Sequence, residues 1–374
     1  MTSKAFGLAQ LGNAFNDGAL SNRNKIINGA MVIDQRNAGA AFTSLTTGVT
    51  YTLDRWCAVL TGVVNTFSVQ RNAGSVTPPA GFSSYLGVVS LAATTPAAGD
   101  FYQIKQHVEG FNVADLAYGT AAAQPITVSF WVRSSLTGNF GLVISWGSSS
   151  SNQRSYPALY AISAANTWEY KTVTIPGDTT AAAGGFETGN GSGIQLRFSL
   201  GGGATNAGTS GAWAAANVQT VTGDTSVVGT NGATFYITGV QLEAGDTATP
   251  FEHRSYGQEL ALCERYYLRQ QGSTLYSFFC TGYLNSATRM FGIFNFPQKM
   301  RATPTLETNT VSNYQILSVT ASPTCTGINL DGQTTNFSAF LVIDASAGGM
   351  TTGQGSIFRG NNTTSAFVAY SAEL

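Results

Sequence analysis

Apolar and polar side chains alternate along most of this chain, and this two-residue period restricts its fold more than any other feature. It is typical of half-buried β strands and is clearest at residues 126–133, 140–146, 168–175 and 194–200. Clusters of Gly, Ser, Thr and Asn separate the strands, as at residues 147–152 and 201–211. Because this spacing suits sandwiches rather than βαβ crossovers, we predict an all-β protein and exclude parallel α/β folds.

One segment departs from this pattern and predicts a helix. In residues 255–271, Leu260, Cys263 and Tyr267 recur at intervals of three and four, and Gly272 is placed to end the helix. The helical segment, residues 255–272, would connect two β regions, residues 26–254 and the shorter 273–374. Residues 1–25 are too short and too polar for a domain, so we expect an N-terminal arm.

The chain carries few charges for its size. Its 374 residues allow two or three domains of about 150 residues each. Charged residues make up 10%, against about 25% in an ordinary soluble protein. The net charge of -1 provides no basic field for phosphates, so we expect no nucleic-acid partner. A surface with so little charge favours burial between copies of the chain, and we expect a homo-oligomer.

Membrane insertion, export and a zinc or disulfide framework are not predicted. The sequence has no run of about 18 apolar residues, and residues 1–10 lack the apolar stretch and cleavage site of a signal peptide. No CxxC pair occurs among the four cysteines, which are Cys57, Cys263, Cys280 and Cys325. We therefore expect buried, reduced thiols, as fits assembly in a cytosol.

Short motifs follow one another in an order that carries a resemblance to a known family. They are Asn28-Gly29-Ala30-Met31, YTLDRW at 51–56, QHVEG at 106–110, SFWVR at 129–133 and FYITGVQLE at 235–243. In this order they resemble the jelly-roll, carbohydrate-binding-module-like domain of bacteriophage tail-fibre and related virion proteins. CERYY at 263–267 and FNFPQKMRATP at 294–304 resemble the linker and C-terminal β domain that often accompany it. The resemblance covers residues 20–320.

The resemblance implies a jelly-roll β-sandwich over residues 26–254, a short helix, and a second, smaller β-sandwich. It also implies a virion fibre protein, assembled in the host bacterial cytoplasm and docked on the particle through residues 1–25, that attaches to a host surface glycan or protein. We expect a homotrimer, because weak glycan contacts need avidity. The helical stripe would pack around the trimer axis or against its own β domains. The alternative function is a structural virion component, such as a head fibre, capsid decoration or tail-assembly protein, with only protein contacts.

Modules of this shape commonly hold a structural calcium, and the resemblance places Asn28 and Glu243 at that site. Thr238 and Gly239, however, stand where a pair of Asp residues is frequent, and calcium prefers six to eight oxygens with several carboxylates. In the alternative, Glu243 accepts backbone or Arg hydrogen bonds at the sandwich corner.

Alternation within two strands indicates the side chains available for sugar recognition. In residues 101–109, Gln103, His107 and Glu109 share the polar face with Lys105. In residues 126–133, Trp131 and Arg133 lie on the polar face. If the strands are neighbours, Trp131 would stack on a sugar ring while His107, Glu109 and Arg133 bond hydroxyls. The alternative is a cross-strand pair of Glu109 and Arg133, with Trp131 under a loop or a neighbouring subunit.

We do not expect an enzyme. The 19 acidic residues show no spacing that singles out a glycosidase pair, and there is no G-x-S-x-G elbow.

Host contact is expected in residues 273–374. Loops at 320–327 and 344–355 are rich in Ser, Thr and Gly, and a polar tip follows at 359–364. Phe358, Arg359 and Asn361 combine a ring for stacking with hydrogen-bonding groups, and a rigid sheet would position them for binding. A solvated hairpin is the alternative for each of them.

Overall fold

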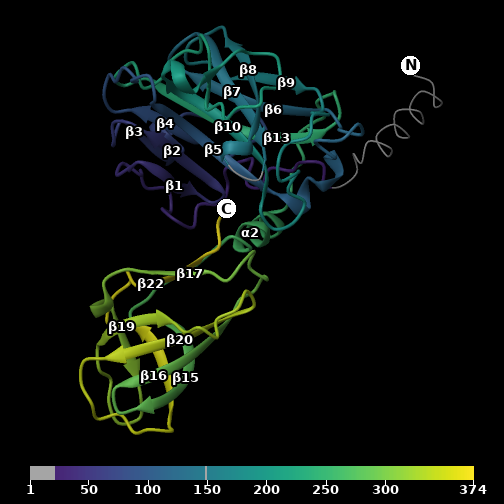
Figure 1. Ribbon diagram of the computed structural model, residues 1–374. Coiled ribbons are helices and arrows are strands. Elements are labelled where there is room, and N and C mark those ends of the chain that lie inside the picture. Colours follow the sequence, from purple (N-terminus) through teal and green to yellow (C-terminus); the bar gives the residue numbers. More distant parts are fainter. Residues whose placement is uncertain (1–21, 148–149) are drawn as a thin grey trace, which may run out of the picture. The chain divides into compact units, whose positions relative to one another are not determined.

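The computed structural model describes residues 22–147 and 150–374 (Figure 1). The chain divides into two units, of which the first runs to Tyr256 and the second covers Gly257–Glu373. Each unit has its own core of buried side chains carried by β strands, so the all-β prediction is confirmed. No helix within the described residues combines the length and apolar character that crossing a bilayer requires.

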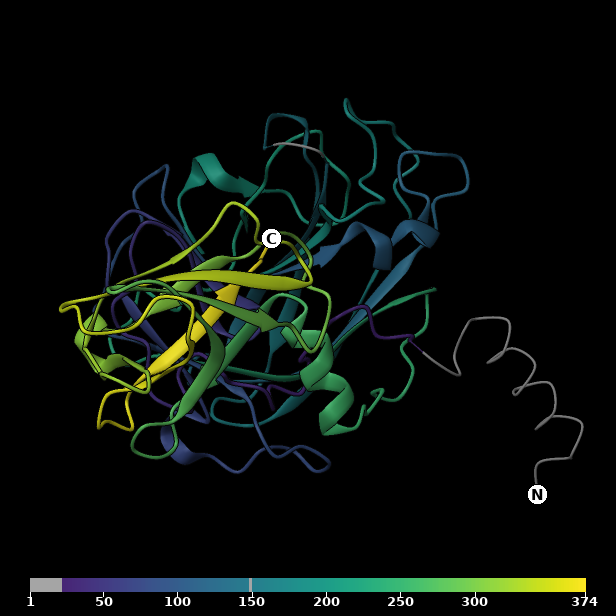
Figure 2. The same cartoon turned by 90° about the horizontal axis from the view of Figure 1, so that it is seen from below.

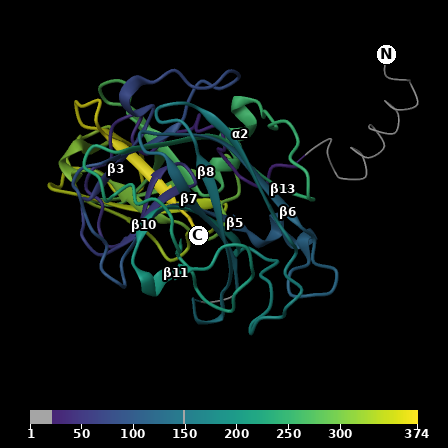
Figure 3. The same cartoon turned by 90° about the horizontal axis from the view of Figure 1, so that it is seen from above.

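Two antiparallel sheets form the jelly roll of the first unit. The six-stranded sheet has the order β1-β2-β5-β10-β7-β8, with strands Gly48–Leu53, Trp56–Thr61, Phe101–Glu109, Ser192–Gly202, Gly138–Trp146 and Arg154–Ile162. The five-stranded sheet has the order β3-β4-β13-β6-β9, with strands Phe67–Arg71, Leu86–Ser90, Thr234–Ala244, Ile126–Ser134 and Glu169–Ile175. In Figure 3, β6 and β13 lie to one side of β5, β7 and β10.

Smaller elements complete this unit and its loops. A two-stranded parallel sheet pairs β11 (Ala207–Gly208) with β12 (Thr220–Val221). Short 3-10 helices η1–η5 lie at Ala73–Ser75, Gly110–Asn112, Ala114–Leu116, Ser150–Asn152 and Ala204–Asn206, whereas η6, at Val311–Asn313, belongs to the second unit.

The predicted inner faces of β5 and β6 fill the space between the two large sheets. Six of their side chains are at most 2% exposed: Tyr102, Ile104, Val108, Val128, Phe130 and Val132. The ring of Phe130 packs edge-on against two others, with centroids 5.0 Å from those of Tyr160 and Phe198. Each fully buried side chain of this kind stabilises the fold by about 1.5–3 kcal/mol. The alternate side chains of the same strands consequently face outward.

The end of the predicted N-terminal arm is part of the jelly roll. Residues 1–21 lie outside the described residues, but Asn24 is buried. Its side chain donates to the Val240 carbonyl at 3.0 Å and accepts from the backbone N–H groups of Ile26 and Leu242 at 2.9 and 3.1 Å. The predicted boundary at residue 26 is therefore too late.

The second unit is the predicted smaller β-sandwich, whose strands run from green to yellow in Figure 2. A three-stranded sheet has the order β14-β22-β17, with strands Tyr267–Gln271, Phe367–Ser371 and Thr305–Thr308. A six-stranded sheet has the order β18-β21-β15-β16-β20-β19, with strands Tyr314–Leu317, Gly355–Gly360, Phe278–Ser286, Arg289–Asn295, Ser338–Ala345 and Cys325–Leu330.

The predicted helix over residues 255–271 is only half correct. Helix α2 covers Tyr256–Glu264, and the chain then enters strand β14. Tyr267 and Leu268 pair with Ser371 and Tyr370 of β22, because bulky aromatic and branched side chains fit a half-buried pleated surface. Tyr267 therefore does not continue a helical stripe with Leu260 and Cys263. As predicted, the side chains of all four cysteines are buried.

Candidate functional site

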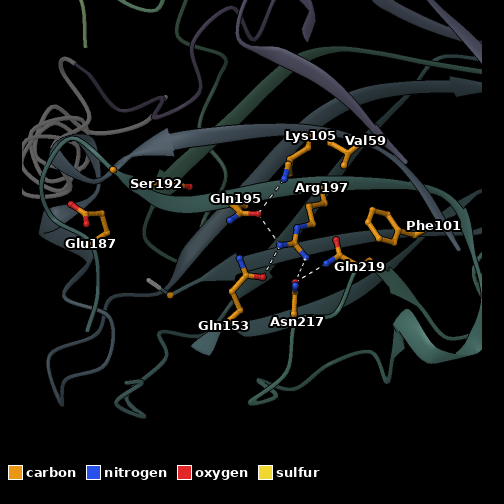
Figure 4. A pocket seen from close by; sticks show the side chains of 12 residues that line it. Val59, Phe101, Lys105, Gln153, Glu187, Ser192, Gln195, Arg197, Asn217 and Gln219 are labelled. Carbon is orange, nitrogen blue, oxygen red and sulfur yellow. Dashed lines mark hydrogen bonds between the residues drawn. The ribbon is translucent and has the colours of Figure 1, made fainter. Parts of the chain in front are cut away.

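A cleft of about 430 Å³ lies on the outer face of the six-stranded sheet (Figure 4). Lys105 of β5 and Gln195 and Arg197 of β10 line it from the sheet. Antiparallel pairing places Arg197 directly opposite Lys105. The rest of the lining comes from β2, from the first residues of β5 and β10, and from loops beside the sheet: Val59, Phe101, Gly147, Gln153, Glu187, Gly191, Ser192, Asn217 and Gln219.

The Arg197 guanidinium holds the walls of this cleft in place. One terminal nitrogen, Nη1, donates to Asn217 Oδ1 at 3.2 Å and to the Val218 carbonyl. The other, Nη2, donates to Gln153 Oε1 at 2.9 Å and to Gln195 Oε1 at 2.8 Å. Arg197 is 2% exposed, and every one of these acceptors is a neutral amide oxygen. The network fixes side chains from separate segments before any ligand arrives.

Further amide side chains extend the network along the cleft. Gln103 Nε2 donates to Gln219 Oε1 at 2.8 Å, and Gln219 Nε2 donates to Asn217 Oδ1 at 2.6 Å. Lys105 Nζ donates to Gln195 Oε1 at 3.5 Å, at the outer limit of a hydrogen bond. Each amide presents both donors and acceptors, which is the capacity that hydroxyl-rich ligands require.

Burial disfavours the charges in the cleft. Desolvation lowers the pKa of Lys105 to about 8; the neighbouring Cys57 acts to raise this pKa and the charge of Arg197 acts to lower it. Desolvation also lowers the pKa of Arg197 to about 9. Both side chains stay protonated at neutral pH. Among the described residues of the lining, Glu187 is the only acid, and its Oε1 accepts a backbone hydrogen bond from Gly189 at 2.7 Å.

The structure places the predicted residues of β5 at or near this cleft. Gln103 belongs to the amide network, and His107 Nδ1 lies 2.8 Å from the hydroxyl of Ser192, which lines the cleft. Glu109 is 2% exposed at the end of the strand. Gln195 and Arg197 were not predicted as site residues, although the alternation in residues 194–200 places both side chains on the outer face of their strand.

Trp131 and Arg133 do not join the β5 residues, so the predicted single cleft is wrong. Strand β5 lies between β2 and β10 of one sheet, whereas β6 lies between β13 and β9 of the other. Their outer faces point to opposite sides of the sandwich. Arg133 Nε instead donates to the Asn166 carbonyl at 3.0 Å, and its guanidinium lies 5.5 Å from the ring centroid of Tyr236.

Trp131 lines a different hollow, which we call the aromatic groove. It too has a volume of about 430 Å³, and it is lined by Phe82, Trp131, Tyr170, Gly239, Ala248, Thr249, Pro250, Phe251 and His253. The ring centroids of Trp131 and Tyr170 are 5.5 Å apart, and those of Phe82 and His253 are 5.4 Å apart. Tyr170 is 44% exposed.

The residues proposed for calcium do not fit that ion. Asn28 Oδ1 accepts from the Ile33 N–H at 3.0 Å. Glu243 Oε1 accepts from Gln241 and from the Thr249 N–H, each at 2.9 Å, and its Oε2 accepts from the Thr249 hydroxyl at 2.6 Å. Protein donors thus occupy both carboxylate oxygens. In the part of the chain that the structure describes, no three His, Cys, Asp or Glu side chains form a metal-binding group.

The structure also corrects the predicted host-contact residues. Phe358 is fully buried, with its ring centroid 5.4 Å from that of Tyr314, because alternation within β21 turns it inward. Asn361 holds loops together by donating to the Ser312 carbonyl at 3.1 Å. Arg359 is half-buried, and its guanidinium lies 4.7 Å from the ring centroid of Tyr276. Phe358 is thus excluded, whereas Arg359 and Asn361, both half-buried, stay candidates for surface contact.

No family model and no curated protein match this chain. Among solved structures, it is similar to the enzymatically active domain of tailspike protein 4 from bacteriophage CBA120, with 13% identity over 60% of this chain and 22% of that chain, and a TM-score of 0.32. The N-terminal cellulose-binding domain of Cellulomonas fimi β-1,4-glucanase C matches with 12% identity over 57% of this chain and 99% of that chain, with a TM-score of 0.29. TmCBM61, in complex with β-1,4-galactotriose, matches with 11% identity over 60% and 99%, with a TM-score of 0.28.

Proposed function

We propose that this protein is a bacteriophage virion fibre protein that attaches the particle to the host surface by binding a glycan in the jelly-roll cleft. The observation that carries the proposal is the cleft itself, a preorganised cavity of about 430 Å³ lined by amide and cationic side chains. Small-molecule sites commonly occupy about 300–1,000 Å³ and use a few fixed polar groups for orientation. Binding without catalysis is proposed, since glycoside hydrolysis uses two carboxylates and Glu187 is the only one that the described part of the chain brings to the lining.

The cleft suits a sugar because it combines two kinds of contact. Amide groups of Gln195, Asn217 and Gln219 offer donors and acceptors to hydroxyls. The ring of Phe101, at one end of the cleft in Figure 4, offers an apolar face for the C–H side of a pyranose. One such cleft binds weakly, and a homotrimer would gain affinity by presenting three copies to one surface.

A glycan array probed with the intact protein tests the proposal. Asn217→Ala removes a half-buried amide from the cleft, and Asn139→Ala removes an exposed amide from the end of β7 as a matched control. We expect the wild type and the control to bind the same glycans and Asn217→Ala to lose at least about tenfold in affinity, the equivalent of one hydrogen bond to a fixed partner. If the folded wild type binds no glycan at all, the proposed function is wrong and a structural role with only protein contacts is favoured.

The virion assignment and the trimer have separate tests. Light scattering should give a mass three times the 39.1 kDa of the chain. A monodisperse monomer at micromolar concentration would contradict the trimer. Antibody labelling of purified phage particles should find the protein on a fibre, with residues 1–25 toward the particle.

A further inference from the structure

Lys105 and Arg197 form a pair of buried positive charges for which the described residues provide no negative partner. They face each other across the register of β5 and β10, an arrangement in which like charges destabilise a sheet. They are 8% and 2% exposed. Among the carboxylates that the structure describes, none makes an ion pair with either side chain.

A second buried arginine in the same sheet shows how the fold otherwise treats such a charge. Arg154, at the start of β8, binds both carboxylate oxygens of Asp178, with its Nη2 at 3.0 Å from Oδ1 and its Nε bonded to Oδ2. A buried cation that lacks such a partner costs free energy, and the cost falls when an anion is supplied. The cations of the cleft therefore differ from Arg154 in that no described carboxylate balances their charge.

Lys105 and Arg197 would play different roles in binding an anionic ligand. All four terminal N–H groups of Arg197 have protein acceptors, so this side chain contributes charge and holds the walls. Lys105 has three donors and a single long hydrogen bond, to Gln195 at 3.5 Å. Figure 4 shows its amino group directed toward Gln195 and Arg197, with Glu187 at the far end of the cleft. The Nε–H of Arg197 has no partner among the described residues either, but this atom is buried, so Lys105 is the cation whose free donors are available to a ligand.

We infer that the cleft selects glycans that carry an anionic group, and that this group binds at Lys105 Nζ beside Arg197. This inference rests on the proposed glycan binding, and it further specifies that the bound sugar carries a negative charge. A carboxylate, a sulfate ester or a phosphate ester would each supply the missing charge and accept up to two charge-assisted hydrogen bonds from Lys105.

The test measures binding of the intact protein to immobilised glycans in four groups: neutral, uronic-acid-containing, sulfated and phosphorylated. We expect one of the anionic groups to bind at least about tenfold more tightly than the neutral sugars of the same backbone. Lys105→Met should abolish that preference, and Lys105→Arg should restore most of it. Lys299→Met, which removes an exposed lysine from the second unit, should change nothing.

The outcomes separate the two proposals. Tightest binding to neutral glycans, or an anionic preference that survives in Lys105→Met, overturns the selection for charge and leaves glycan binding intact. Absence of binding to every group contradicts both. Preference for one anionic group identifies whether carboxylate, sulfate or phosphate is the natural partner. Circular dichroism spectra of each variant establish that a lost preference does not result from unfolding.

Discussion

The two outer faces of the jelly roll carry hollows of equal volume and opposite chemistry. The cleft on the six-stranded sheet holds amides and two cations, with Arg197 and Lys105 almost wholly buried. The aromatic groove on the five-stranded sheet holds rings, and His253 and Tyr170 are exposed. Both faces arise from the same alternation, in which every second side chain enters the core. Packing in the core restricts the inner positions to apolar side chains, whereas the outer positions of the two sheets can differ in chemistry independently of each other.

The two faces also differ in how much the fold depends on them. In the cleft, one guanidinium donates to oxygens of Gln153, Gln195, Asn217 and Val218. Its removal takes this donor from the Gln153 side-chain oxygen and the Val218 carbonyl, whereas Gln195 and Asn217 keep Lys105 and Gln219 as donors. In the groove, Trp131 contacts Tyr170 by ring packing alone, which a substitution weakens gradually.

The largest expected effect is therefore on stability. Arg197→Met should destabilise the first unit by about 3 kcal/mol, since each buried acceptor left without a donor costs about 1–3 kcal/mol and removal of the buried charge offsets part of the sum. Trp131→Ala, in the groove, should cost about 1 kcal/mol because the side chain is only half-buried. Urea denaturation followed by circular dichroism measures both. Equal losses for the two variants would remove the proposed difference between the faces.

Next in size is the effect on glycan affinity. Asn217→Ala should weaken binding by about tenfold and Trp131→Ala by less than about twofold, because the groove lies on the opposite face from the cleft. Titration calorimetry with the best glycan from the array gives both values. A larger loss of affinity for Trp131→Ala than for Asn217→Ala would indicate that Trp131 stacks on the sugar and that the glycan binds in the aromatic groove.

The alternation of apolar and polar residues correctly predicted which side chains of β5 and β6 face the core, but it did not predict which strands are neighbours in a sheet. It turned Tyr102 and Val128 inward, but it does not report which strands pair, because pairing joins segments far apart in the chain. Trp131 and Glu109 were thus assigned to one cleft although their strands belong to different sheets. Phe358 shows the opposite fault: alternation in residues 355–360 points it inward, yet its neighbouring polar turn suggested a surface role. The hydrogen bonds of Arg197 could not be predicted from the sequence, because their acceptors come from three segments that are far apart in the chain.

A smaller effect concerns the pH dependence of binding to the preferred anionic glycan. Lys105 receives the anion only when protonated, and burial lowers its pKa to about 8. Affinity should therefore stay constant from pH 6 to about 7 and fall by about tenfold by pH 9. Burial lowers the pKa of Arg197 to about 9, so Arg197 begins to lose its own charge near the upper end of this range, and Cys57 is the other titratable group that acts on Lys105. A neutral glycan should show no such fall, and an equal fall for neutral and anionic glycans would contradict the assignment to Lys105.

The smallest expected effect is a gain in stability. Lys105→Met removes a buried charge that has no counter-ion and should stabilise the ligand-free protein by about 1 kcal/mol at pH 7. The pKa of Lys105 is about 8 in the folded protein and 10.5 in the unfolded chain, so between these values the unfolded chain binds more protons. Wild-type stability relative to Lys105→Met should therefore rise over this pH range until the gain has vanished. Trp131→Phe, which changes no titratable group, should keep a constant difference from wild type in the same urea titrations. A Lys105→Met difference that is equally flat would mean that Lys105 is neutralised in the folded protein by a group other than a ligand, and the case for an anionic glycan would lose its electrostatic basis.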